Sequence, residues 1–61
     1  MELNIGSIVN LEAAKHKLRV EHIGNIFILT NKGGVNYFAH RVSGDMVRVY
    51  DSYNKNEEGA A

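Results

Sequence analysis

Between residues 18 and 51 the chain alternates between apolar and polar side chains over short segments, as β-strands do. Residues 18–23 alternate over most of their length, and residues 26–30 form an apolar run of β-branched and aromatic side chains. Gly24 and Asn25 separate the two segments. Glycine at the first position of a two-residue loop favours a type II′ turn, because that position needs a positive φ. This part of the chain is therefore predicted to be a β-hairpin.

Two further strands are predicted after this hairpin. Residues 35–42 follow a loop at 31–34 that ends in two glycines, and residues 46–51 follow a turn at 43–45. Successive strands joined by short loops form an antiparallel meander. The sequence thus predicts a mainly all-β domain of four to five short strands.

The N-terminal part of the chain carries two overlapping signals. Residues 3–11 can form a strand with a bulge at Gly6. Residues 10–17 can form one or two helical turns capped by Asn10. A longer helix would place apolar side chains on its opposite side, so the periodicity ends it early. We expect a first strand, then a short helical turn near residues 11–16, then the meander.

The simplest hairpin registers divide the meander into two faces. With a two-residue first loop and four-residue loops after it, the expected pairs are Ile23 with Ile26, Thr30 with Val35, and Val42 with Val47. One face then collects mostly apolar residues: Leu18, Val20, His22, Phe27, Leu29, Phe38, His40, Val42, Val47 and Val49. The other face is mixed: Arg19, Glu21, Ile23, Ile26, Ile28, Val35, Tyr37, Arg41, Arg48 and Tyr50. The first face is predicted to be the core, with Phe27 opposite Phe38, and the second places Arg41 opposite Arg48.

A sheet that is apolar on both faces is predicted to curl into a small barrel or to be covered in an oligomer. A chain of 61 residues can bury only a small core, so we also expect a homo-oligomer. Residues 1–53 are predicted to form this single small β domain. Residues 54–61 lack a large apolar side chain and are predicted to be a disordered C-terminal tail.

Three segments resemble known small β-barrels. Ile5-Gly6-Ser7-Ile8-Val9-Asn10-Leu11, followed by short strands, resembles the opening strand of SH3-like barrels. Asn25-Ile26-Phe27-Ile28-Leu29 and Arg41-Val42-Ser43-Gly44-Asp45-Met46-Val47 resemble the two short motifs of Sm-like RNA-binding proteins. That resemblance implies a ring of subunits that holds single-stranded RNA near these turns. Here Val42 and Ser43 separate the arginine from the glycine, and the aspartate expected shortly before Asn25 is absent.

Composition argues against several functional classes. The chain has no cysteine, so it has neither a disulfide framework nor a cysteine-based zinc site. It contains no P-loop, no Gly-x-Gly-x-x-Gly and no Gly-x-Ser-x-Gly motif, and we predict neither an enzyme nor a cofactor. No secretory signal and no membrane-spanning apolar run are visible. The expected location is the cytoplasm, without a membrane partner.

The histidines and aspartates are the other candidates for chemistry. Zinc needs three or four converging ligands, and the candidate set is His16, His22 and His40. His22 and His40 fall on one predicted face without a clear carboxylate partner, so they are expected to pack on phenylalanines and to bind no metal. Asp45 and Asp51 are interpreted as turn and edge residues.

The formal net charge is zero, but the charges are unevenly distributed. Residues 15–50 contain six basic and two acidic residues, a net charge of +4. Guanidinium groups neutralise phosphates, and aromatic rings provide stacking platforms for unpaired bases. The residues predicted to bind nucleic acid are Arg19, Lys32, Tyr37, Arg41, Arg48 and Tyr50.

A second predicted surface consists of Ile23, Ile26 and Ile28, which lie on the face opposite the predicted core. The sequence therefore supports two hypotheses. The first is a non-enzymatic module that binds nucleic acid or a nucleotide phosphate through an Arg/Tyr sheet face. The alternative is a protein–protein interaction module, or a small inhibitor of the kind found in phages and plasmids, that acts through the apolar face or an exposed edge strand.

Overall fold

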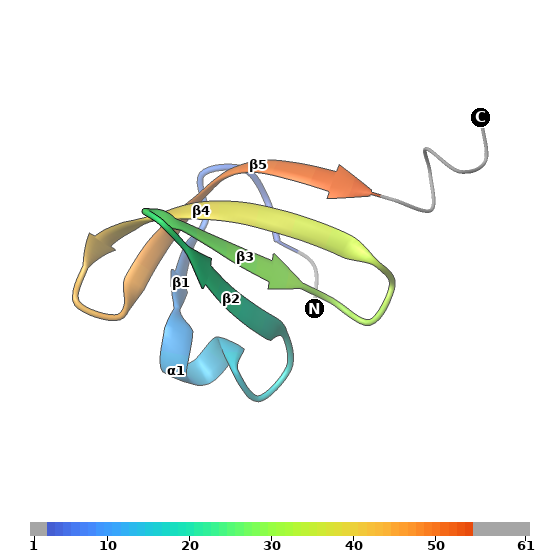
Figure 1. Ribbon diagram of the computed structural model, residues 1–61, viewed down its shortest axis with the longest axis horizontal. Helices are drawn as coiled ribbons and strands as arrows, with labels where there is room; N and C mark the ends of the chain where they lie inside the picture. The colour runs from blue at the N-terminus through green and yellow to red at the C-terminus, as the bar shows by residue number, and fades with distance from the viewer. Residues whose placement is uncertain (1–2, 55–61) are drawn as a thin grey trace.

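The computed structural model describes residues 3–54 as one antiparallel sheet with a single helical turn. In chain order the elements are β1 (Ile8–Asn10), α1 (Leu11–Ala14), β2 (Arg19–Ile23), β3 (Ile26–Thr30), β4 (Val35–Ser43) and β5 (Met46–Asn54) (Figure 1). The strand order is β1-β5-β4-β3-β2, so β2 to β5 form the predicted meander and β1 is added beside β5. The mainly β architecture with one short helix is confirmed.

The start of the chain differs in detail from the expected bulged strand. Residues 4–7 form a turn in which the Ser7 N–H donates to the Asn4 carbonyl at 3.0 Å. Gly6 has φ +92° at the third position of this turn, where a type II turn requires a positive φ. The Gly6 N–H then donates to the carbonyl of Val49 at 2.7 Å, which attaches the turn to β5. A turn therefore takes the place of the predicted bulge, and β1 begins only at Ile8.

α1 begins where the sequence predicts. The Asn10 side-chain Oδ1 accepts from the backbone N–H groups of Glu12 (2.9 Å) and Ala13 (3.2 Å), as expected of an N-cap. Leu11 and Ala14 are buried, and the helix connects β1 and β2, which lie at opposite ends of the sheet order (Figure 1). Because the two edge strands are joined through α1, the curled sheet and the helix enclose one core. Within residues 3–54 no helix is both long and apolar enough to cross a membrane.

The core consists of residues from every element except the exposed strand β2. The buried apolar residues are Val9, Leu11, Ala14, Leu18, Phe27, Leu29, Tyr37, Ala39, Val47 and Val49. We call the sheet face that carries Phe27, Leu29, Tyr37, Ala39, Val47 and Val49 the inner face, and the opposite one the outer face. The predicted core is correct in β3 and β5 and wrong in β4, where Tyr37 and Ala39 take the place expected for Phe38 and His40.

The error in β4 comes from the loop between β3 and β4. Asn31 is paired with Val35 through the Asn31 N–H, which donates to the Val35 carbonyl at 3.0 Å. The loop is therefore three residues long and not four, and it ends at Gly34, which has φ +87°. Thr30 consequently pairs with Asn36 and not with Val35. This one-residue slip turns every side chain of β4 to the other face.

The register between β4 and β5 has two irregularities. Ser43 pairs with Met46 across a two-residue turn, and a register shift lies between Arg41 and Ser43. A second shift separates the pairs Ala39–Val49 and Phe38–Asp51, which leaves Tyr50 as an extra residue in β5. The predicted pair of Arg41 with Arg48 is therefore wrong, and Arg48 pairs with His40. The predicted pair of Phe27 with Phe38 is wrong because of the slip between β3 and β4, and Phe27 pairs with Ala39.

β5 extends beyond its predicted end. Asn54, the first residue of the predicted tail, belongs to β5 and pairs with Val35. The rest of the predicted tail, residues 55–61, lies outside the described residues.

Candidate binding surfaces

The six residues predicted to bind nucleic acid do not form one surface. Tyr37 is only 4% exposed and belongs to the core, so its predicted role as a stacking platform is wrong. Arg41 lies on the inner face beside the ring of Phe27. Arg48 and Tyr50 are exposed, and Arg48 alternates with the buried valines of β5, which places it on the outer face.

The two remaining residues of this set are separate from Arg48 and Tyr50. Arg19 lies on the edge strand β2 and pairs with Glu21, with 3.5 Å between the guanidinium Nε and the carboxylate Oε1. Lys32 lies in the loop between β3 and β4, where it lines a depression together with His16 and Lys17. The charged face expected from the sequence is therefore divided among several parts of the molecule.

A different basic site forms where β4 extends past the β2–β3 turn. Ile26, the first residue of β3, pairs with His40, so residues 41–43 extend beyond the turn at Gly24 and Asn25. The space beside this step, which we call the notch pocket, has a volume of about 400 Å³. Its lining residues are His22, Gly24, Asn25, Phe27, His40 and Arg41.

Phe27 holds two of the polar groups of the notch pocket in place. The imidazole of His22 stacks on the Phe27 ring, with 4.1 Å between centroids and 10° between planes. The Arg41 Cζ atom lies over the same ring, 5.3 Å from its centroid. A cation–π contact of this kind is worth about 0.5–1 kcal/mol at an exposed site. Both side chains are thus oriented before any ligand arrives.

A third polar side chain of the notch pocket, His40, comes from the other side of the sheet. His40 stacks on Tyr50, with 4.1 Å between ring centroids and 7° between planes. The sequence placed His22 and His40 on one face beside two phenylalanines, and this is wrong because of the slip in β4. His22 has an aromatic partner of the expected kind, Phe27, whereas the partner of His40 is a tyrosine.

The charge of the notch pocket is not balanced by a carboxylate. None of its lining residues is acidic. The side-chain ion pairs among residues 3–54 are Lys15 with Glu12 and Arg19 with Glu21, and neither includes Arg41. The same part of the chain contains no group of three histidine, aspartate or glutamate side chains placed to share a metal ion. The arrangement suits an anion better than a cation.

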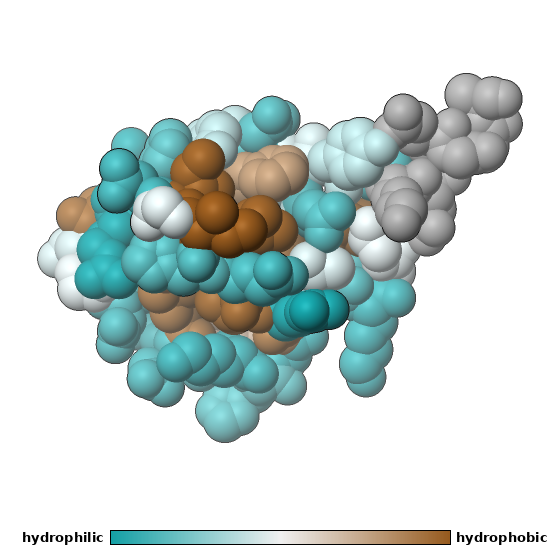
Figure 2. Space-filling view, in the orientation of Figure 1, coloured by the Kyte–Doolittle hydropathy of each residue, from teal (hydrophilic) through white to brown (hydrophobic). Residues whose placement is uncertain are grey.

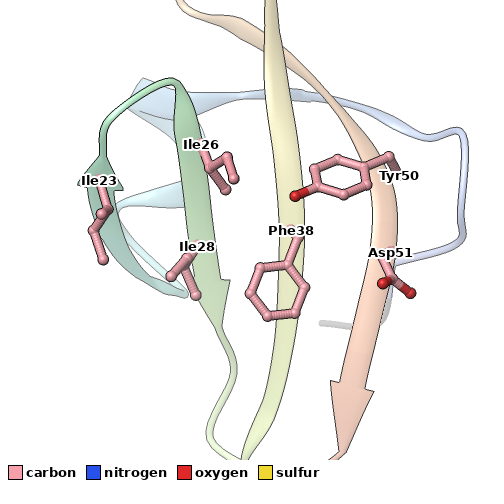
Figure 3. A pocket seen from close by; sticks show the side chains of 6 residues that line it. All are labelled: Ile23, Ile26, Ile28, Phe38, Tyr50 and Asp51. Carbon is pink, nitrogen blue, oxygen red and sulfur yellow. The ribbon is translucent and has the colours of Figure 1, made fainter.

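A second pocket lies on the outer face of the sheet. Its lining residues are Ile23, Ile26, Ile28, Phe38, Tyr50 and Asp51, and its volume is about 310 Å³ (Figure 3). We call it the isoleucine pocket. In the space-filling view, hydrophobic side chains gather over β3 and β4 and are bordered by hydrophilic ones (Figure 2). The three isoleucines named from the sequence therefore share one surface, and Phe38, Tyr50 and Asp51 are additions that the sequence-based registers missed.

The fold and these two pockets define a small antiparallel β domain with a basic notch at one end of the sheet and an apolar pocket on its outer face. Comparison with known proteins finds no match to a family model, a curated protein or a solved structure.

Proposed function

We propose that this protein is a non-enzymatic module that binds nucleic acid or a nucleotide phosphate at the notch pocket. The observation that carries the proposal is the position of Arg41. Its guanidinium lies over the Phe27 ring beside His22 and Asn25, in a pocket without an acidic residue. Arginine presents five N–H donors in a planar fork, which matches the geometry of a phosphate group.

The neighbours of Arg41 add donors of the same kind. Asn25 carries a side-chain NH2 group, and the imidazole of His22 has at least one N–H donor. Hydrogen bonds to a charged acceptor are shorter and about twice as strong as neutral ones. A phosphate group held by Arg41 with help from these donors is therefore the ligand chemistry that the pocket supports best.

Aromatic rings beside the notch pocket fit an unpaired base. The His40 ring borders the pocket and is held by its stack on Tyr50, which lines the neighbouring isoleucine pocket. Single-stranded nucleic acids bind through stacking on such rings together with contacts between basic side chains and the backbone. This favours a single-stranded ligand over a duplex.

The resemblance to Sm-like proteins noted in the sequence supports the same proposal, a single-stranded nucleic acid bound at the notch pocket. We infer that the curled five-stranded sheet is an SH3-like small barrel. The two segments that resemble the Sm-like motifs begin at Asn25 and Arg41, and both of these residues line the notch pocket. Sm-like proteins hold single-stranded RNA near the corresponding turns, which adds to the case from the pocket chemistry.

The test is a titration of a fluorescently labelled single-stranded oligonucleotide, followed by anisotropy at two ionic strengths. We expect binding that weakens linearly with the logarithm of the salt concentration, because phosphate contacts release counterions. Arg41→Gln should weaken binding about tenfold, as expected for the loss of a charge-assisted contact. Arg19→Gln is the matched control, because Arg19 is an exposed strand arginine that pairs with Glu21.

Two results would overturn the proposal. One is no binding by the wild-type protein at low salt. The other is an equal loss of affinity in Arg41→Gln and Arg19→Gln, which would mean that only total charge matters. Competition with inorganic phosphate and with a nucleoside monophosphate then separates recognition of the phosphate alone from recognition of phosphate and base together.

A further inference from the structure

We propose that the isoleucine pocket is a docking site for a segment of a partner protein that carries apolar side chains followed by a lysine or arginine. This inference goes beyond the proposed nucleic-acid function, since it concerns a different pocket. It stands on the shape of the apolar surface and on the charge at one end of that surface.

The pocket crosses the sheet and does not run along one strand. Ile23 comes from β2, Ile26 and Ile28 from β3, Phe38 from β4, and Tyr50 and Asp51 from β5 (Figure 3). Neighbouring strands lie about 4.8 Å apart, so four strands give an apolar stripe about 14 Å long. Two or three apolar side chains of a partner segment span that length.

The apolar side chains of the stripe are accessible to a partner. Ile23 is 58% exposed, and Ile26, Ile28 and Phe38 are only partly buried. Contiguous apolar surface with a polar border marks interaction sites on soluble proteins. With a volume of about 310 Å³, the pocket is at the small end of ligand pockets and suits side chains better than a cofactor.

Asp51 makes the two ends of the apolar stripe different in charge. Its carboxylate stands at the β5 end of the pocket, and one of its oxygens accepts from the Ser52 N–H at 2.8 Å. The side-chain ion pairs within residues 3–54 do not include Asp51. The chemistry that complements an apolar stripe ending in a carboxylate is an apolar segment ending in a cation.

Residues 3–54 supply no such segment outside the pocket. Their other exposed large apolar side chains are Ile5, Ile8, Val42 and Tyr53, and none of these is followed directly by a lysine or arginine. The apolar residues of α1, Leu11 and Ala14, are buried in the core. Residues 55–61 contain a lysine but no large apolar side chain. We therefore assign the complementary segment to a different protein and not to a second copy of the described residues.

Three labelled peptides of equal length test this directly: one with leucines followed by lysine, one with leucines followed by glutamate, and one with serines followed by lysine. Anisotropy titrations of the wild-type protein should show the Leu/Lys peptide binding about tenfold more tightly than the Leu/Glu peptide. The Ser/Lys peptide should not bind. Ile23→Lys should abolish binding, whereas Val42→Lys, an equally exposed strand position outside the pocket, should preserve it.

The decisive variant is the charge reversal Asp51→Lys. It should invert the preference, so that the Leu/Glu peptide becomes the tighter ligand. Asp45→Lys, which makes the same charge change in the exposed β4–β5 turn, should leave the wild-type preference intact. Backbone amide spectra of each variant check that the sheet is retained.

The proposal is wrong if Asp51→Lys and Asp45→Lys have the same effect, or if the Ser/Lys peptide binds as well as the Leu/Lys peptide. Light scattering coupled to size exclusion gives a further check. A wild-type dimer that Ile23→Lys converts to a monomer would mean that a second copy covers this face, which also overturns the assignment. The peptide titrations do not involve Arg41. A negative result in them would therefore overturn the docking proposal and leave the proposal of nucleic-acid binding at the notch pocket to its own test.

Discussion

The imidazole of His40 lies flat against the phenol ring of Tyr50, with 4.1 Å between the ring centroids. His40 lines the notch pocket and Tyr50 lines the isoleucine pocket, so this one stack connects the two sites across the sheet. A ligand that moves either ring therefore changes the surface offered to the other ligand. The stack is a direct side-chain contact between the two proposed binding sites.

We predict that Tyr50→Ala weakens binding at both pockets. It removes one wall of the isoleucine pocket and also frees His40, so affinity for the Leu/Lys peptide and for the oligonucleotide should each fall. An aromatic pair is worth about 0.5–1.5 kcal/mol, which corresponds to about twofold to tenfold. Tyr53→Ala is the control, because Tyr53 is an exposed tyrosine of the same strand that lines neither pocket. Loss of peptide binding alone, with oligonucleotide affinity unchanged, would contradict the link.

Tyr37 provides a prediction about stability. Because Tyr37 is buried among the core residues of the inner face, Tyr37→Ala should lower the free energy of unfolding by about 3–5 kcal/mol. Tyr37→Phe keeps the ring, so it should cost less than about 1 kcal/mol and leave oligonucleotide affinity unchanged. Urea denaturation and anisotropy measure the two quantities. If Tyr37→Phe weakened oligonucleotide binding as much as Arg41→Gln, the placement of Tyr37 in the core would be refuted.

The N-cap of α1 provides a third prediction. Asn10→Ala removes the acceptor for the Glu12 and Ala13 N–H groups and should destabilise the fold by about 1 kcal/mol. Asn10→Ser retains a capping oxygen, although it loses the contact between the Asn10 amide and the Met46 sulfur. The midpoints of urea unfolding should therefore rank wild type and Asn10→Ser close together, with Asn10→Ala clearly lower. Equal losses in both variants would assign the effect to Met46 and not to the cap.

Local signals were sufficient for much of the fold. The turn at Gly24 and Asn25 was predicted from two residues, and the φ of +59° at Gly24 agrees with it. The cap at Asn10 was likewise read from its immediate neighbours. Both features depend on a few adjacent residues, so a single sequence contains the information that they need.

The register of β4 could not be derived in the same way, because it depends on whether Asn31 belongs to the loop or pairs with Val35. The Asn31 side-chain oxygen accepts from the N–H groups of Gly33 (2.9 Å) and Val35 (3.0 Å), which draws Asn31 into the pairing and shortens the loop to three residues. Two glycines at the end of this loop were the available signal, since a three-residue hairpin loop favours glycine at its left-handed position. That reading would have moved Tyr37 into the core and Phe38 to the outer face.

The composition of the two pockets was harder still to predict. The notch pocket depends on β4 being longer than β3, and the isoleucine pocket depends on the extra residue in β5. Neither feature leaves a pattern in the hydrophobic periodicity, because each is decided by pairing between strands. The isoleucines were found from sequence because they occupy the best-determined hairpin, and Asp51 was missed because it follows the bulge.

The extra residue in β5 has a consequence for how the protein tolerates change. It allows two consecutive side chains, Tyr50 and Asp51, to line the same outer pocket, where regular alternation would turn one of them inward. Removing Tyr50 would restore regular alternation and leave Asp51 as the one residue of β5 in this pocket, so the pocket would lose its tyrosine wall and His40 its stacking partner, even though every isoleucine stayed in place. The binding surface is thus encoded by the spacing of the chain as well as by its chemistry, and a one-residue deletion here should be more damaging than most substitutions.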